Sequence, residues 1–136
     1  MGEEDVMDAE RGIRAVLDSL EKAYFEGVDA VAILDLLYET DAIVVGEGYA
    51  AALRGRHALE EQSRSISASL GPHPEVTFTI AAPLQACGDT AVTLLSAVLR
   101  PDVPDAQTVC SRVLAGWRKG SCGWRICLEM YSEGEP

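Results

Sequence analysis

The sequence predicts an α+β protein in which helices come first and a curved antiparallel sheet follows. Up to about residue 71, most segments carry apolar residues three and four positions apart, the spacing of helices that bury one face. From residue 75 onward, long apolar or alternating runs are separated by short turns, as in neighbouring antiparallel strands. Elements segregated along the chain in this way define the α+β class.

Three helices are expected. The helical spacing runs from Glu3 to about Glu26, with acids in its first turns and Gly27 as its stop. A second, shorter helix covers residues 30 to about 38, and Asp29 can cap it. The period resumes in the segment "RGRHALEEQSRSISASLG", residues 54–71, where a glycine and a following proline predict the end.

The strands are expected in one hairpin and one meander. "AIVVGEGYAAAL" contains two apolar runs around Gly46-Glu47-Gly48, which predicts a hairpin with a three-residue loop. The meander should comprise residues 75–84, 90–100, 107–119 and 124–132. Its last turn is Gly-Ser-Cys-Gly, which should bring Trp117 and Trp124 close together across the hairpin.

Composition limits the class of partner. A chain of 136 residues is expected to form one domain, residues 1–136, with a core of about 9–132 and short acidic tails. The net charge of −11 and the scattered basic residues argue against nucleic acid. No apolar run approaches the roughly 20 residues that span a bilayer, and the acidic start does not resemble a secretion signal. We therefore expect a cytoplasmic protein without a membrane partner.

No metal or cofactor is predicted. The four cysteines show no C-x-x-C spacing, and the two histidines, His57 and His73, stand apart in polar segments. In a chain without a secretion signal, the cysteines are expected to be thiols.

Three stretches resemble the nuclear transport factor 2-like superfamily, which includes the SnoaL-like and ketosteroid isomerase-like proteins and the association domain of calcium/calmodulin-dependent kinases. They are "AYFEGVDAVAILDLLYETDAIVV", "LRGRHALEE" and "WRKGSCGWRICLEMYS". The resemblance covers residues 9 to 132. It implies a cystatin-like α+β roll: a cone-shaped, curved antiparallel sheet packed on three N-terminal helices. It also implies an apolar pocket inside the cone and a homodimer formed through the outer face of the sheet.

The resemblance also implies which activities the chain has lost. In the isomerases, a tyrosine, a general base and a second carboxyl do the chemistry, and the matching positions here hold Leu20, Gly46 and Ala115. Steroid isomerisation by that mechanism is therefore not expected. The histidines of the association domains are replaced by Leu128 and Met130, which argues against assembly of a kinase scaffold.

Strict alternation along the last strand assigns its two faces. Trp124, Ile126, Leu128 and Met130 should face the pocket, and Arg125, Cys127, Glu129 and Tyr131 should face outward. The residues expected to bind a ligand are Tyr24, Tyr38, Trp117, Leu128 and Met130, although core packing is by itself sufficient reason for the aromatic rings.

Three other polar residues are also assigned positions from the sequence. Arg112 should pair with Glu129 or anchor an acidic ligand. Glu47 and Tyr49 should lie at the rim of the cone.

Three functions remain open on the sequence. The first is a small-molecule-binding homodimer whose ligand is apolar or acidic. The second is a cyclase, dehydratase or isomerase that uses one carboxylate or tyrosine as acid or base. The third is an assembly module. No residue can be assigned a catalytic role, because no polar pair is placed inside the cone.

Overall fold

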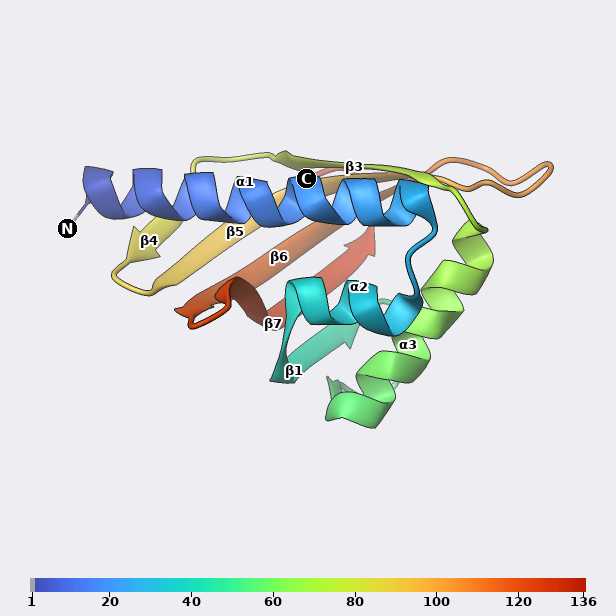
Figure 1. The fold of residues 1–136 in the computed structure, drawn as a ribbon, viewed down its shortest axis with the longest axis horizontal. Helices are drawn as coiled ribbons and strands as arrows, with labels where there is room; N and C mark the ends of the chain where they lie inside the picture. The colour runs from blue at the N-terminus through green and yellow to red at the C-terminus, as the bar shows by residue number, and fades with distance from the viewer. Residues whose placement is uncertain (1) are drawn as a thin grey trace.

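The computed structural model describes residues 2–136 and confirms the α+β class (Figure 1). The helices are α1 (Glu3–Glu26), α2 (Ala30–Leu37) and α3 (Arg56–Leu70). The strands are β1 (Tyr38–Gly46), β2 (Leu53–Arg54), β3 (Glu75–Ile80), β4 (Gln85–Cys87), β5 (Thr90–Arg100), β6 (Val109–Gly120) and β7 (Gly123–Glu133).

The boundaries of α1 and α2 follow from local chemistry. Gly27 ends α1 with a φ of 74°, in the left-handed region, and its N–H donates to the carbonyl of Tyr24. Asp29 caps α2, because its carboxylate accepts a hydrogen bond from the N–H of Val31 at 3.1 Å. The turn between the two helices is therefore specified by adjacent residues, and both helices were predicted correctly.

The strands form one curved sheet in the order β2-β1-β7-β6-β5-β3, with β4 also paired to β5. All neighbours are antiparallel except β1 and β7, which are parallel. The expected wholly antiparallel sheet is thus corrected to a mixed one. Since β1 and β7 are far apart in the chain, no turn dictates their relative direction.

The expected hairpin is present in a looser form. β2 is only two residues long and pairs Leu53 with Val44, so the connection spans residues 47–52 rather than three residues. The N–H of Glu47 donates to the carbonyl of Tyr131 on β7 at 3.1 Å. The chain therefore continues along β7 before it reverses.

The helix α1 lies across the concave face of the sheet, with α2 and α3 near one end (Figure 1). The core between them contains both tryptophans. The indole N–H of Trp117 donates to the Thr93 hydroxyl at 2.9 Å, and the ring of Trp124 lies against Gly12 of α1. The two rings close the core under α1. None of the described helices has both the length and the apolar character needed to cross a membrane.

One extra residue in β7 changes which side chains face inward. Trp117 pairs with Ile126, but Gly116 pairs with Leu128, so Cys127 is a β-bulge. Beyond the bulge the alternation is inverted. Leu128 and Met130 lie on the outer face with 49% and 52% of their surface exposed, whereas Glu129 is only 6% exposed. The prediction that Leu128 and Met130 face the interior is wrong, as is the outward assignment of Glu129 and Tyr131.

Candidate functional site

A cavity of about 550 Å³ lies between α1, α3 and the concave face of the sheet. Its volume is in the range of sites for drug-sized molecules. The inner end is formed by buried aliphatic side chains, and the rim includes the exposed residues Glu47 and Gln107. Most of the wall is apolar and includes Leu17, Leu70, Phe78, Leu95, Val113 and Ile126.

Glu129 is the buried acid of this cavity. It follows the bulge on β7, and its Oε1 accepts a hydrogen bond of 2.7 Å from the Tyr38 hydroxyl. Tyr38 lies where α2 ends and β1 begins, so the helix-to-strand transition positions the donor. Burial raises the pKa of Glu129 to about 7, although the hydrogen bond from Tyr38 opposes the shift. This carboxyl group therefore exchanges its proton near neutral pH.

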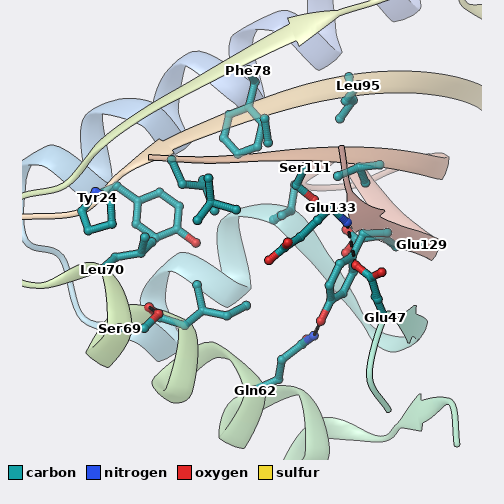
Figure 2. A pocket seen from close by; sticks show the side chains of 18 of the residues that line it. Tyr24, Glu47, Gln62, Ser69, Leu70, Phe78, Leu95, Ser111, Glu129 and Glu133 are labelled. Carbon is teal, nitrogen blue, oxygen red and sulfur yellow. Dashed lines mark hydrogen bonds between the residues drawn. The ribbon is translucent and has the colours of Figure 1, made fainter. Parts of the chain in front are cut away.

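Two tyrosines beside Glu129 remain protonated. Burial, and then the negative charge of Glu129, raise the pKa of Tyr24 to about 12. Burial and Glu129 also raise the pKa of Tyr38 well above its ordinary value. The Tyr24 hydroxyl is directed into the cavity (Figure 2), and it has no hydrogen-bond partner among residues 2–136. Tyr24 is therefore a hydrogen-bond donor available to a bound molecule.

Tyr131 occupies the space beside Gly46. A Cβ on Gly46 would lie 2.5 Å from the ring of Tyr131, so a larger residue at this position would displace that ring. The Tyr131 hydroxyl accepts a hydrogen bond of 2.9 Å from the buried Gln62 of α3, which is visible in Figure 2. The position that resembles the isomerase general base is thus packed against an aromatic ring.

Two further acids lie at the rim. The carboxylate of Glu47 accepts a hydrogen bond of 2.8 Å from the N–H of Glu133, which joins the loop after β1 to the end of β7. Figure 2 shows Glu47 and Glu133 on the side of the cavity away from Tyr24. Both side chains are exposed, so their charges are solvated at the entrance.

The predicted ligand residues separate into three groups. Tyr24 and Tyr38 line the cavity. Trp117 lies in the core with 1% of its surface exposed and is not part of the cavity wall. Leu128 and Met130 lie on the opposite face of the sheet, as described above.

Arg112 does not pair with Glu129. It donates to the Ser132 hydroxyl at 2.8 Å and, with Leu114 and Met130, lines a shallow hollow on the outer face. An anchor for an acidic ligand inside the cone is therefore lost from this position.

Sequence reasoning missed Glu129, Gln62 and Tyr131. Strict alternation placed Glu129 and Tyr131 outside, and Gln62 was hidden among the polar residues of α3. One signal was available: Gly116 stands in the middle of β6, and a glycine inside a strand often marks a bulge. The register shift indeed lies between Gly116 and Trp117.

The fold is that of nuclear transport factor 2-like proteins, a cystatin-like α+β arrangement. A ketosteroid isomerase-like protein from Erwinia carotovora atroseptica is 20% identical, with a TM-score of 0.71 over 98% of this chain and 99% of that chain. A protein of unknown function from Mycobacterium tuberculosis is 17% identical, with a TM-score of 0.77 over 100% of this chain and 78% of that chain.

A third structure, a nuclear transport factor 2-like protein from Novosphingobium aromaticivorans, is 20% identical, with a TM-score of 0.70 over 94% of this chain and 83% of that chain. No family model matches the chain, and no curated protein matches its sequence. At these identities the similarity defines the fold, and the function has to be argued from the site.

Proposed function

We propose that this protein binds a small, largely apolar molecule in the cavity beneath α1. The observation that carries the proposal is a hollow of about 550 Å³ with an aliphatic and aromatic wall and a few polar groups directed into it. Those polar groups, Glu129, Tyr38 and Tyr24, would orient one end of the ligand, and the apolar wall would hold the rest.

The proposal is tested by filling the cavity. Ser111 is half-buried in β6 and lines the cavity, so Ser111→Trp adds a ring where the ligand would lie. Native mass spectrometry of the purified protein should detect a co-purified small molecule in the wild type and lose it in Ser111→Trp. Thr77→Trp, on an exposed position of β3, is the matched control and should retain the molecule. Equal occupancy in both variants would show that any bound molecule lies elsewhere.

A second candidate function is acid–base catalysis, and the placement of Glu129 favours it. Glu129 pairs directly with Ala115 across the β6–β7 ladder. Ala115 is the position that resembles the isomerases' second carboxyl. The carboxyl group would thus be displaced by one strand, and Tyr24 lies one helical turn beyond Leu20, the position that resembles the isomerases' tyrosine.

In this second function, Glu129 would accept or donate the proton, and Tyr24 would donate a hydrogen bond to the reacting group. A general acid–base is most effective when its pKa is near the working pH, as that of Glu129 is. The reaction would be a cyclisation, dehydration or isomerisation of an apolar carbonyl compound. Screening such compounds for loss of deuterium next to the carbonyl would test it, since Glu129→Gln should abolish any exchange that the wild type catalyses.

We also propose that two copies associate through the outer face of the sheet. Val45, Val92, Leu114, Leu128 and Met130 are large apolar side chains exposed on strands of this sheet. Exposed apolar clusters of this kind are typical of interfaces between subunits. A second copy would cover this face without entering the cavity on the other side of the sheet.

A further inference from the structure

The charges around the cavity all have one sign. Three carboxyl groups line it: Glu129 at the buried end, and Glu47 and Glu133 at the rim. The described part of the wall contains no lysine, arginine or histidine. Arg14, whose guanidinium donates to the carbonyl of Phe78, is already bound to two acids of its own helix. An anionic ligand would therefore find no charge to neutralise it.

Glu129 itself lacks a cationic partner. Its Oε1 accepts from Tyr38, and no lysine or arginine within residues 2–136 forms an ion pair with it. Its Oε2 receives no hydrogen bond from the described residues. A carboxylate has about four acceptor sites, so most of its capacity is unused. Burial of a carboxylate without a cation is unfavourable, and a cationic ligand would relieve that cost.

The remaining wall suits the rest of such a ligand. Four aromatic rings border the cavity, from Tyr24, Tyr38, Phe78 and Tyr131, and the faces of aromatic rings attract cations. The aliphatic side chains around them would accept a hydrocarbon skeleton. Within residues 2–136, no three acidic, histidine or cysteine side chains are arranged to hold a metal ion, so the carboxylates suit an organic cation.

We infer that the ligand is a small apolar amine, bound as its ammonium ion with the nitrogen at Glu129 and the hydrocarbon part against the apolar wall. This inference rests on the proposed binding function and specifies its ligand class. Glu47 and Glu133 attract the cation at the entrance, and Glu129 forms the close contact inside. An uncharged alcohol of the same skeleton keeps the apolar contacts and can still donate a hydrogen bond to Glu129, but it lacks the positive charge that pairs with the carboxylate.

The test compares probes that share a skeleton and differ in charge. 1-Adamantylamine, 1-adamantanol and adamantane-1-carboxylate are titrated by calorimetry at pH 8 in 0.15 M salt, which screens long-range attraction to the acidic surface. 3-Phenylpropylamine, 3-phenylpropanol and 3-phenylpropionate repeat the comparison on a narrower skeleton. In at least one series the amine should bind about tenfold or more tightly than the alcohol. The carboxylate should bind most weakly.

Three variants identify the group responsible. Glu129→Gln keeps the shape of the side chain and should remove the preference for the amine, so that the amine loses much more affinity than the alcohol does. Glu47→Gln should weaken the amine by less than about threefold, because its charge is exposed. Glu10→Gln removes an equal charge from the exposed surface of α1 and should have no effect.

Lowering the pH gives an independent readout. The amine probes stay protonated, so their preference over the alcohols should fall as the pH is lowered from 8 to 6 and Glu129 takes up its proton. The titratable groups that border Glu129 are Tyr24, Tyr38 and Tyr131, and each has its pKa raised above 10. They remain neutral throughout this range.

The possible outcomes distinguish failure of the amine inference from failure of the proposed binding function. An alcohol or carboxylate that binds as tightly as its amine in every series that binds would overturn the amine inference and leave the binding function standing. An amine preference that persists in Glu129→Gln would also overturn it. If no probe of either skeleton binds, the inference fails, and native mass spectrometry of the Ser111→Trp pair then decides the proposed function separately.

Discussion

Glu129 is the residue whose surroundings differ most from those of an ordinary glutamate. It is buried on an apolar face, and Tyr38 alone among the described residues donates to it. Its pKa of about 7 means that the folded protein binds this proton more tightly than the unfolded chain does. The contribution of Glu129 to stability is therefore full below its unfolded pKa and is lost as the pH rises through 7.

The loss of stability with rising pH leads to a first prediction. Between pH 5.5 and pH 8, the free energy of unfolding of the wild type should fall by about 2 kcal/mol relative to that of Glu129→Gln. Urea unfolding of both proteins at several pH values measures the difference. The free energy of unfolding of the Glu10→Gln control should change with pH as that of the wild type does. If Glu129→Gln also followed the wild type at every pH, Glu129 would ionise as an exposed glutamate does, and the prediction would be wrong.

Single glycines decide how closely some elements approach. Gly12 is in the interior of α1, where glycine is usually destabilising. Its lack of a side chain is required here, because a Cβ would lie 2.3 Å from Cδ1 of the buried Trp124 ring. The close packing of α1 on β7 thus depends on glycine at position 12.

The second prediction concerns this contact between elements. Replacing a glycine with alanine on the exposed face of a helix usually stabilises a protein by up to about 1 kcal/mol. Gly12→Ala should instead destabilise this protein by about 1–2 kcal/mol, because the added methyl group overpacks the contact with Trp124. Thermal and urea unfolding measure the change. In a Trp124→Leu background the sign should reverse, since the overlap is removed. A stabilising Gly12→Ala in the wild-type background would mean that the ring moves freely.

The elements also show what sequence reasoning can and cannot predict. The ends of α1, α2 and α3 were predictable because their caps and periods are local. The parallel pairing of β1 with β7 was not, since it joins segments some 80 residues apart and no turn specifies it. β4 was missed because a three-residue strand is too short to show alternation.

The candidate site was predictable only in part, because some of its residues are placed by local patterns and others by the pairing of distant strands. Tyr24 and Tyr38 could be placed because each ends a helix on its buried face. Glu129 could not, because its direction depends on how β7 pairs with β6 across the bulge at Cys127. Local patterns thus identified the helical side of the cavity, and the pairing of strands decided the other side.

On the scale of the whole molecule, the two faces of the sheet have separate roles. The concave face covers the cavity and the core, and the outer face exposes Leu114, Leu128 and Met130. The proposed self-association through that outer face can therefore be disrupted without changing the cavity wall.

The third prediction follows from this separation. At micromolar concentration, light scattering should give the mass of a dimer for the wild type and of a monomer for Leu128→Arg/Met130→Arg, with unchanged circular dichroism. Phe25→Arg replaces another large exposed apolar residue, on α1, and should remain dimeric. A monomeric wild type would contradict the proposal. Loss of folding in the double variant would contradict the outward placement of its two side chains.

The bulge at Cys127 also bears on how such a protein changes over generations. Deletion of that single codon would make Leu128 follow Ile126 directly, so regular alternation would keep Leu128 and Met130 on the outer face and Glu129 in the cavity. Both faces of the sheet would retain their present polarity. The bulge thus allows this strand to gain or lose one residue without inverting the side chains beyond it.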